Sequence, residues 1–229
     1  YLRSIGAFHS WLYDKGYIER RPKVVQCDEN APTVKYFSEP DLGSLLSLDL
    51  SRELSTINGT WVKNWNHYKR AFQFYLNTGC RLREPFDGAI QKHGEHNWLV
   101  VPPEKSKTKR ERVIKLTDND LPILNEMRER VSRAGSKKYA TDKYTKVLRV
   151  ACRVLKIQEK RTVHSLRHTY GCIRRLESNG NVPLIMDEMG HVNISTTMKY
   201  IKIPLLRLED DFPSYKKQPE KSQFGHLYR

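Results

Sequence analysis

The stretch HSLRHTYGCIRRLESNGNVPLIMDEMGHVNISTTMKY, residues 164–200, carries helical patterning from one end to the other. Apolar residues at helical spacing predict three short helices here, over 165–178, 183–189 and 194–200. An Asn-Gly-Asn turn at 179–181 separates the first helix from the second. His191 then comes directly after a helix that ends at a glycine.

Outward from this stretch, most of the chain is also patterned as helix. Helical spacing or capping signals predict further helices near 2–12, 38–48, 61–76, 117–127 and 144–155. The exception is 97–116, where two β-type runs flank a basic turn and predict a hairpin. The expected fold class is therefore mainly α with a small antiparallel β-hairpin or sheet (α+β). The aromatic side chains at 61–75 are expected in the core rather than on a stacking surface.

The charge balance indicates a polyanionic partner. The 229 residues include 41 Lys and Arg against 26 Asp and Glu, a net charge of +15, together with 4 Trp, 12 Tyr and 7 Phe. Basic disordered tails lack so many aromatic residues, so a folded basic domain is expected. No apolar run approaches the ~18 residues of a membrane helix, and no signal peptide opens the chain. Because the chain starts with Tyr rather than Met, a fragment or processed form is expected.

The cysteines argue against a disulfide scaffold. Cys27, Cys80, Cys152 and Cys172 form no Cys-x-x-Cys pair. This usage favours reduced thiols in a cytosolic or nuclear-type compartment.

Four segments carry side chains suited to reaction at a phosphodiester. Guanidinium groups match the equatorial oxygens of a pentacoordinate phosphorane, a nucleophile must lie in line with the leaving oxygen, and an acid must protonate that oxygen. The segments are TGCRLRE at 78–84 with Arg81 and Glu84, SKTKRERV at 106–113 with Lys107, HSLRH at 164–168 with His164 and Arg167, and MGHVNISTTMKY at 189–200 with His191 and Tyr200.

These four segments, in this order, resemble the catalytic domain of tyrosine recombinases of the phage-integrase family. That family shows a T-G-x-R-x-x-E block, a hairpin lysine, H-x-x-R, and L-G-H followed by T-T-x-x-Y. The resemblance covers residues 36–202. Any single block would be a weak signal, whereas four ordered blocks with compatible spacing are specific.

The resemblance implies a phosphate clamp and a nucleophile. Arg81 and Arg167 would hold the scissile phosphate. Glu84 would contact Arg81 and orient it without touching the phosphate. Tyr200 would form a 3′-phosphotyrosyl bond and free a 5′-hydroxyl. No metal ion, nucleotide or other cofactor is implied, because the covalent bond stores the phosphodiester energy.

The resemblance also implies groups that move protons and contact DNA. Lys107 would be the general acid for the 5′-oxygen, His164 would assist proton transfer, and His191 would hydrogen-bond the phosphate. Lys107 is preferred over its neighbours because Ser-Lys-Thr before the second strand is a family-like pattern, although a basic hairpin holds several candidates. The other cations of this hairpin are expected to contact DNA: Lys105, Lys109 and Arg110.

The sequence departs from the family pattern in three places. Met189 stands where Leu is usual, which is a volume-conserving change of little consequence. The segment between Arg167 and His191 is one residue longer, near Asn181, which falls in a loop. Lys202 stands where other members have a histidine, and we have no interpretation of this exchange.

The site residues also have plainer interpretations. His164 and His168 have a spacing seen in zinc sites, with His191 as a third ligand, but no adjacent Glu or Cys completes a familiar set. His168 is therefore interpreted as a structural residue of its helix. Tyr200 could be an ordinary core tyrosine, and its nine-residue offset from His191 is what favours the nucleophile. The basic run at 105–112 could be a solvated charged surface.

The resemblance further sets the expected domain organisation. The expected parts are the last helix of a truncated core-binding domain at 1–22, a linker at 23–35, the catalytic domain at 36–213 and a basic C-terminal tail at 214–229.

The expected function is DNA strand exchange by an integrase from a mobile element, virus or phage. The partner would be double-stranded DNA held mainly through phosphates. If the protein holds about six or more phosphates, raising salt from ~50 to ~200 mM would weaken binding ~10³-fold. Homo-oligomers, from dimer to tetramer, would form on the DNA, with the tail after Tyr200 docking on a neighbour. The protein would act in the cytoplasm or on the host chromosome, without a membrane.

Two alternatives remain open. A type IB topoisomerase or a telomere resolvase also makes a 3′-phosphotyrosine, although T-T-x-x-Y close behind Gly-His favours the recombinase. The second alternative is a catalytically silent DNA-binding domain, although all six catalytic positions that the resemblance implies hold the expected residue types.

Overall fold

The computed structural model describes residues 2–20, 34–49, 64–106, 109–157 and 160–216. The chain divides into two units, Tyr1–Thr33 and Val34–Arg229. The first unit contains helix α1 (Leu2–Asp14), as its helical spacing predicts, and Gly16 follows it with φ +73°. The expected linker at 23–35 lies outside the described residues, apart from its last two positions.

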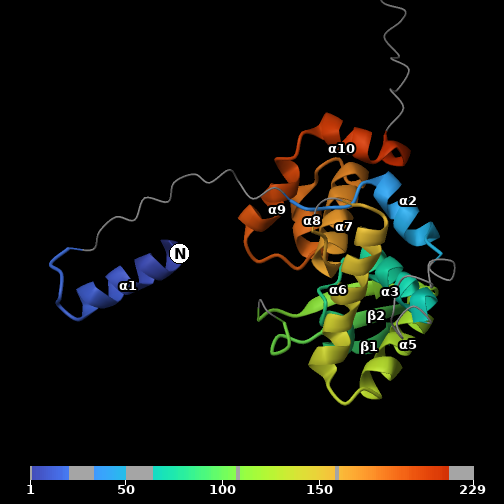
Figure 1. The fold of residues 1–229 in the computed structure, drawn as a ribbon, viewed down its shortest axis with the longest axis horizontal. Helices are drawn as coiled ribbons and strands as arrows, with labels where there is room; N and C mark the ends of the chain where they lie inside the picture. The colour runs from blue at the N-terminus through green and yellow to red at the C-terminus, as the bar shows by residue number, and fades with distance from the viewer. Residues whose placement is uncertain (1, 21–33, 50–63, 107–108, 158–159, 217–229) are drawn as a thin grey trace, which may run out of the picture. The chain divides into compact units, whose positions relative to one another are not determined.

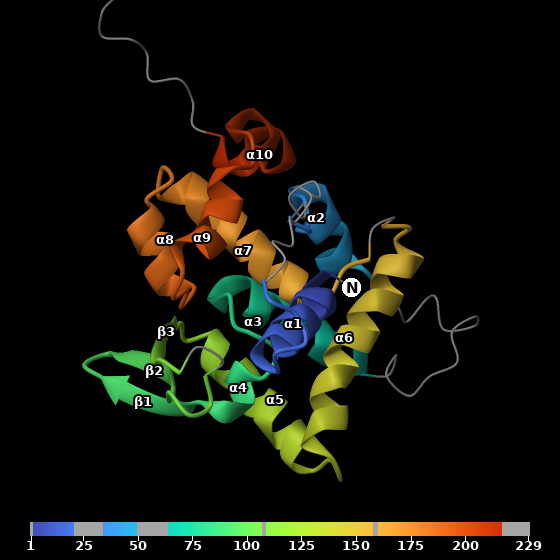
Figure 2. The same cartoon turned by 90° about the vertical axis from the view of Figure 1, so that its left-hand side faces the viewer.

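The second unit consists mainly of helices, with one small sheet at its edge (Figures 1 and 2), which confirms the expected fold class. Its helices are α2 (Glu39–Ser47), α3 (Trp65–Thr78), α4 (Glu84–Asp87), α5 (Asp120–Ser132), α6 (Lys137–Val154), α7 (Val163–Glu177), α8 (Val182–Glu188), α9 (Ile194–Ile201) and α10 (Leu205–Asp211). None of the helices in the described part of the chain has the length and apolar character that a membrane span needs.

The sheet has three antiparallel strands, β1 (Ala89–His93), β2 (His96–Val101) and β3 (Arg112–Leu116), in that order. The predicted hairpin at 97–116 is confirmed as the pair β2–β3, in which Val101 lies opposite Arg112. The sequence does not predict β1, because AIQKH is almost wholly exposed and has no apolar alternation. Gly94, with φ +60°, lies in the tight turn that joins β1 to β2.

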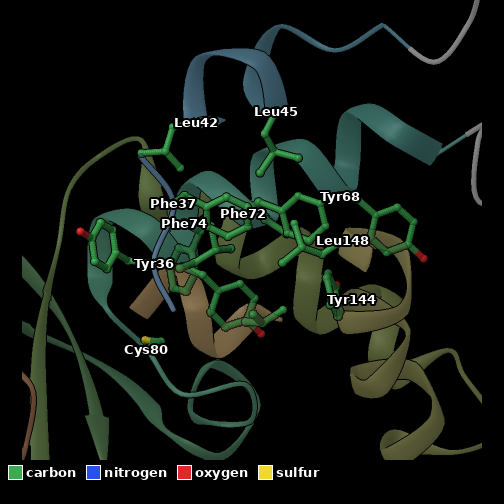
Figure 3. Close-up of a cluster of buried hydrophobic side chains, with 14 of the residues drawn as sticks. Tyr36, Phe37, Leu42, Leu45, Tyr68, Phe72, Phe74, Cys80, Tyr144 and Leu148 are labelled. Carbon is green, nitrogen blue, oxygen red and sulfur yellow. The ribbon is translucent and has the colours of Figure 1, made fainter. Parts of the chain in front are cut away.

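The core of the second unit forms where α3 packs against α7, with α2 and α6 beside them. Figure 3 shows side chains from α2, α3 and α6 meeting in one cluster. Its members include Leu42, Leu45, Tyr68, Phe72, Phe74, Tyr144 and Leu148. The expectation that the aromatic residues of this region belong to the core is confirmed for Trp65–Tyr75, and 61–63 lie outside the described residues. This core packs α3 against α7, and predicted site residues lie on α7 and just beyond the end of α3.

The chain continues after Tyr200 into α10 and a short 3-10 turn, Pro213–Tyr215, neither of which the sequence patterning predicts. Leu208 and Phe212 of this segment are buried, and the Tyr36 hydroxyl donates to Asp211 Oδ2 at 2.6 Å. This segment therefore packs on its own domain. Docking of the tail on a neighbour stays a prediction, and residues 217–229 lie outside the described residues.

Candidate active site

The first predicted site segment begins where α3 ends. Gly79 has φ +58°, and its N–H donates to the Tyr75 carbonyl at 3.0 Å, which closes the helix with a left-handed residue. A side chain at this position would also collide with a ring, since a Cβ on Gly79 would lie 2.5 Å from Tyr170 Cδ1. The turn that places Arg81 just beyond the helix therefore depends on glycine.

Arg81 and Glu84 form the ion pair that their spacing predicts. Arg81 Nη1 lies 2.6 Å from Glu84 Oε1, and the Arg81 backbone N–H donates to Glu84 Oε2 at 2.7 Å. Glu84 is buried, which by itself would raise the pKa of its carboxyl. The cationic groups of Arg112, Arg167 and Arg81, with that backbone N–H, hold the pKa of Glu84 below its usual value. Glu84 is therefore an anion that fixes the orientation of Arg81.

Arg112, the first residue of β3, also belongs to the site, although the sequence analysis does not single it out. Its guanidinium donates to the Glu84 carboxylate, to the Gly79 carbonyl at 3.3 Å and to the Glu188 carbonyl at 2.9 Å. Only 4% of Arg112 is exposed. It thus joins the sheet to the ends of α3 and α8.

The strand pattern contained a signal for Arg112. Alternate residues of a strand share a face, so Arg112 lies on the same face of β3 as Ile114 and Leu116, which are buried. An arginine at an inward-facing position needs anionic or carbonyl partners. The pattern therefore indicates a buried partner for Arg112, without indicating which one.

Arg167 lies in α7 and is 1% exposed. Its Nη1 donates to the Gly79 carbonyl at 2.7 Å, and its Nη2 donates to the Met189 carbonyl. Burial, with the nearby charges of Arg112 and Arg81, lowers the pKa of Arg167 to about 9. The guanidinium therefore stays protonated at neutral pH.

Carbonyl groups at the end of α8 hold three guanidinium groups near one another. Each guanidinium donates to one of three successive carbonyls: Arg112 to Glu188, Arg167 to Met189 and Arg81 to Gly190. The last carbonyls of a helix carry partial negative charge, so they and the Glu84 carboxylate offset the repulsion among the three cations. A phosphate that entered here would meet a cationic site that is already assembled.

Tyr200 lies on α9 and is 2% exposed. Its hydroxyl oxygen is 2.8 Å from His168 Nδ1, and its ring is parallel to that of His191, with ring centroids 6.2 Å apart. His191 Nδ1 is 2.8 Å from Thr197 Oγ1. The rings of His164 and His168 meet edge to face at 4.5 Å between centroids. His168 therefore contacts the predicted nucleophile directly, which revises its interpretation as a purely structural residue.

The protonation states of these groups follow from their burial. Burial, with smaller contributions from neighbouring histidine and cationic side chains, lowers the pKa of His168 and of His191 to about 3 in each case. Burial also raises the pKa of Tyr200 above its usual value, against the opposing influence of Arg167 and Arg81. At neutral pH the free protein therefore holds two neutral imidazoles and an un-ionised phenol.

Five of the six predicted catalytic side chains line one open pocket of about 440 Å³: Arg81, His164, Arg167, His191 and Tyr200. His168 and Lys199 also line this pocket. The sixth residue, Lys107, lies outside the described residues. The hairpin cations expected to contact DNA are exposed: Lys105, Lys109 and Arg110.

A zinc site at the three histidines finds no support in the described side chains. Within the described ranges, no three His, Cys, Asp or Glu side chains gather in a way that could hold a metal ion. The Nδ1 atoms of His168 and His191 lie instead against the hydroxyl groups of Tyr200 and Thr197.

Comparisons with known proteins bear on the family and the fold of this chain. Residues 51–204 match the model of the phage integrase family. The tyrosine recombinase XerD of Oceanobacillus iheyensis is 23% identical over 240 residues, which cover 94% of this chain and 74% of XerD.

Two solved structures share the fold. The Tn1549 transposon integrase, solved in complex with circular intermediate DNA, matches with a TM-score of 0.58 at 16% identity, over 94% of this chain and 77% of that one. The XerH site-specific recombinase, solved as a pre-cleavage complex with its difH substrate, matches with a TM-score of 0.53 at 14% identity, over 77% of this chain and 51% of that one. The match with XerH therefore spans about half of that protein's length.

Proposed function

Because the chain belongs to the phage integrase family, we propose that it acts as a site-specific recombinase, which cleaves and rejoins double-stranded DNA through a 3′-phosphotyrosyl intermediate. The observation that carries the proposal is the pocket lined by Arg81, Arg167, His191 and Tyr200. Transesterification at a phosphodiester needs fixed cations, a hydrogen-bonding group and a nucleophile in one place, and this pocket holds all three.

In the cleavage step, Tyr200 Oη attacks the scissile phosphorus and the bond from phosphorus to the 5′-oxygen breaks. Arg81 and Arg167 hold the non-bridging oxygens, and a ring nitrogen of His191 donates to one of them. The phenol loses a proton and the 5′-oxygen gains one, so the proton count is unchanged. Attack by a 5′-hydroxyl on the phosphotyrosine reverses the step, and one phosphoester bond is made for each one broken.

The experiment that tests the proposal is a suicide substrate, a duplex from the DNA flanking the source gene in which the freed 5′ fragment diffuses away. We expect an SDS-resistant protein–DNA adduct, and mass spectrometry of the digested adduct is expected to place the nucleotide on Tyr200. Binding without any adduct would support a silent DNA-binding domain. Relaxation of supercoiled plasmid by monomers, without exchange between two sites, would support a type IB topoisomerase, and hairpin ends on linear product would support a telomere resolvase.

We expect Lys107 to protonate the leaving 5′-oxygen. Lys107→Ala is expected to slow cleavage of ordinary DNA about 10²-fold, which is the usual contribution of a positioned acid. A substrate with sulfur in place of the 5′-bridging oxygen is expected to restore most of the rate, because a thiol with a pKa of about 8.5 leaves as the thiolate. Rates of adduct formation on both substrates measure this.

The matched control for Lys107 is Lys109→Ala, which removes an exposed lysine from the same hairpin. Because Lys109 is expected to contact DNA, this variant is expected to bind DNA more weakly, but to cleave both substrates at the wild-type rate once protein is saturating. Loss of cleavage in Lys109→Ala alone would assign the acid to that residue instead.

The exposed face of α6 offers further phosphate contacts. Lys146, Arg149 and Arg153 are exposed, and their spacing places them on one side of the helix. Among the described residues, no carboxylate pairs with Arg149 or Arg153, whereas the exposed arginines of α5 pair with glutamates of their own helix, Arg130 with Glu126 and Arg133 with Glu129. The cations of α6 are therefore available to a polyanion.

Replacing Arg149 and Arg153 together with Gln is expected to make DNA binding less dependent on salt. Each lost phosphate contact lowers the slope of log K against log salt by about 0.9, so the slope is expected to fall by about 2. The double variant Arg130→Gln/Arg133→Gln removes the same charge and is expected to leave the slope unchanged. Equal slopes in the two double variants would show that α6 does not contact DNA.

The same proposal extends to assembly and location. Exchange between two duplexes requires paired protomers, so dimers to tetramers are expected on DNA. Leu205 and Leu206, which are 51% and 75% exposed on α10, offer an apolar contact to a neighbour. The relation to a bacterial XerD supports action in the cytoplasm or on the host chromosome, and the likeness to the Tn1549 transposon integrase supports an origin in a mobile element.

A further inference from the structure

One face of α7 contacts Tyr200 at three points. His168 Nδ1 lies 2.8 Å from the Tyr200 hydroxyl oxygen, and the Arg175 Nη1 donates to the Tyr200 carbonyl at 2.7 Å. Between them the ring lies directly on the helix backbone, since a Cβ on Gly171 would be 2.8 Å from Tyr200 Cε1. Positions 168, 171 and 175 are three and four residues apart and so share one helix face. A single helix therefore holds the hydroxyl, the ring and the backbone of this tyrosine.

We propose, on the basis of the proposed function, that His168 is a positioning residue that accepts a hydrogen bond from the Tyr200 hydroxyl and aims its oxygen into the phosphate pocket. The backbone and ring contacts limit where the tyrosine lies, and the hydroxyl contact holds the reacting oxygen at the far end of the ring and orients its O–H bond. Both side chains line the pocket that Arg81 and Arg167 also line. An error of about 1 Å in the placement of a reacting atom costs about 10²-fold in rate, so this contact bears directly on cleavage.

The surroundings of His168 suit an acceptor. The charged and titratable groups that face it are His164 and Arg167 on α7, with Lys199 and Tyr200 on α9. Burial first, and then His164, Arg167 and Lys199, lower the pKa of His168 to about 3, so the ring is neutral. A neutral imidazole that carries its proton on Nε2 presents Nδ1 as an acceptor, and Tyr200 can then donate its only hydroxyl proton.

The test compares three substitutions by single-turnover adduct formation on the suicide substrate. His168→Leu removes the acceptor and is expected to slow cleavage at least tenfold, while the Kd for DNA changes less than about twofold. His168→Asn places an amide oxygen where Nδ1 stands and is expected to restore the rate to within about threefold of wild type. His168→Gln places its acceptor one bond further out and is expected to be as slow as His168→Leu. If His168→Leu does not fold, the comparison of His168→Asn with His168→Gln still tests the proposal.

A change of leaving group separates this role from acid catalysis. The 5′-bridging sulfur substrate removes the need for a proton on the leaving atom but not the need to aim the nucleophile. The slow rates of His168→Leu and His168→Gln are therefore expected to persist on it, in contrast to the rescue expected for Lys107→Ala. His93→Leu, which changes an exposed histidine of β1, is the matched control and is expected to behave as wild type on both substrates.

The outcomes separate the two proposals. A wild-type chain that forms no adduct at Tyr200 contradicts the proposed function itself. A wild-type chain that forms the adduct while His168→Leu matches its rate contradicts only the role of His168. Equal rates for His168→Asn and His168→Gln, or rescue of His168→Leu by the sulfur substrate, would also overturn that role.

Discussion

The Tyr200→Phe variant is expected to form covalent protein–DNA adduct at less than about a thousandth of the wild-type rate, because it lacks the oxygen that we propose attacks the phosphate. The rest of the site is expected to remain. The substitution removes one oxygen and leaves His168 Nδ1 without its hydroxyl partner, which costs about 1 kcal/mol of folding free energy. DNA affinity is expected to stay within about twofold of wild type, since the phosphate is held by Arg81 and Arg167.

Tyr36→Phe is the matched control for this variant. Tyr36 is also buried, at 6% exposed, and its hydroxyl likewise makes one side-chain hydrogen bond, to Asp211. Loss of the Tyr36 hydroxyl is expected to leave adduct formation at the wild-type level. Denaturing gels of both variants on the suicide substrate make the comparison, and equal adduct from Tyr200→Phe and wild type would remove Tyr200 from the reaction.

The Arg112→Met variant is expected to lower the free energy of unfolding by about 3 kcal/mol at neutral pH, which is typical when a buried charge loses its partner. Methionine replaces the apolar stem of the arginine side chain but donates no hydrogen bond. Among the described residues, Glu84, which is 5% exposed, would then keep Arg81 alone as an ion-pair partner, and the Glu188 carbonyl would lose the Arg112 donor. Urea unfolding followed by circular dichroism measures the change.

The pH dependence of the same variant gives an independent check. In the wild type the pKa of Glu84 is held below its usual value of 4.5. The stability from its ionised form is therefore present above that pH, and is lost as the pH falls through the lower, folded pKa. Without Arg112 the largest of the interactions that lower the pKa of Glu84 is lost, so this pKa is higher in the folded variant than in the folded wild type. The difference in stability between wild type and Arg112→Met is therefore expected to narrow as the pH falls through the range between these two folded pKa values.

Arg133→Met is the matched control, because Arg133 also pairs with a glutamate but with 75% of its side chain exposed. This change is expected to cost less than about 1 kcal/mol. Equal losses of stability in Arg112→Met and Arg133→Met would show that Arg112 does not neutralise a buried Glu84. The same conclusion would follow if the difference in free energy of unfolding between wild type and Arg112→Met did not depend on pH.

Much of the architecture was predictable because it depends on contacts between near neighbours in the chain. The helix predicted near 38–48 from its capping signals begins with a capping box, in which Asp41 N–H donates to Ser38 Oγ at 3.3 Å. The apolar stripe of α3 ends at Gly79 as its pattern indicates, and the ion pair of Arg81 with Glu84 joins residues three positions apart. Periodicity, capping and short spacing encode such features, so reading the chain locally finds them.

The placement of the site required the tertiary structure. Motif spacing pointed to Arg81, Arg167, His191 and Tyr200, but only the packing of α3, α7, α8 and α9 shows that their side chains line one pocket. The contact of His168 with Tyr200 spans 32 residues, and the contact of Arg112 with the Glu188 carbonyl spans 76. Local patterning indicates only that a side chain is inward-facing. The chemistry of a buried group depends on the carboxylates, carbonyls and rings that the fold places against it, and these come from distant segments of the chain.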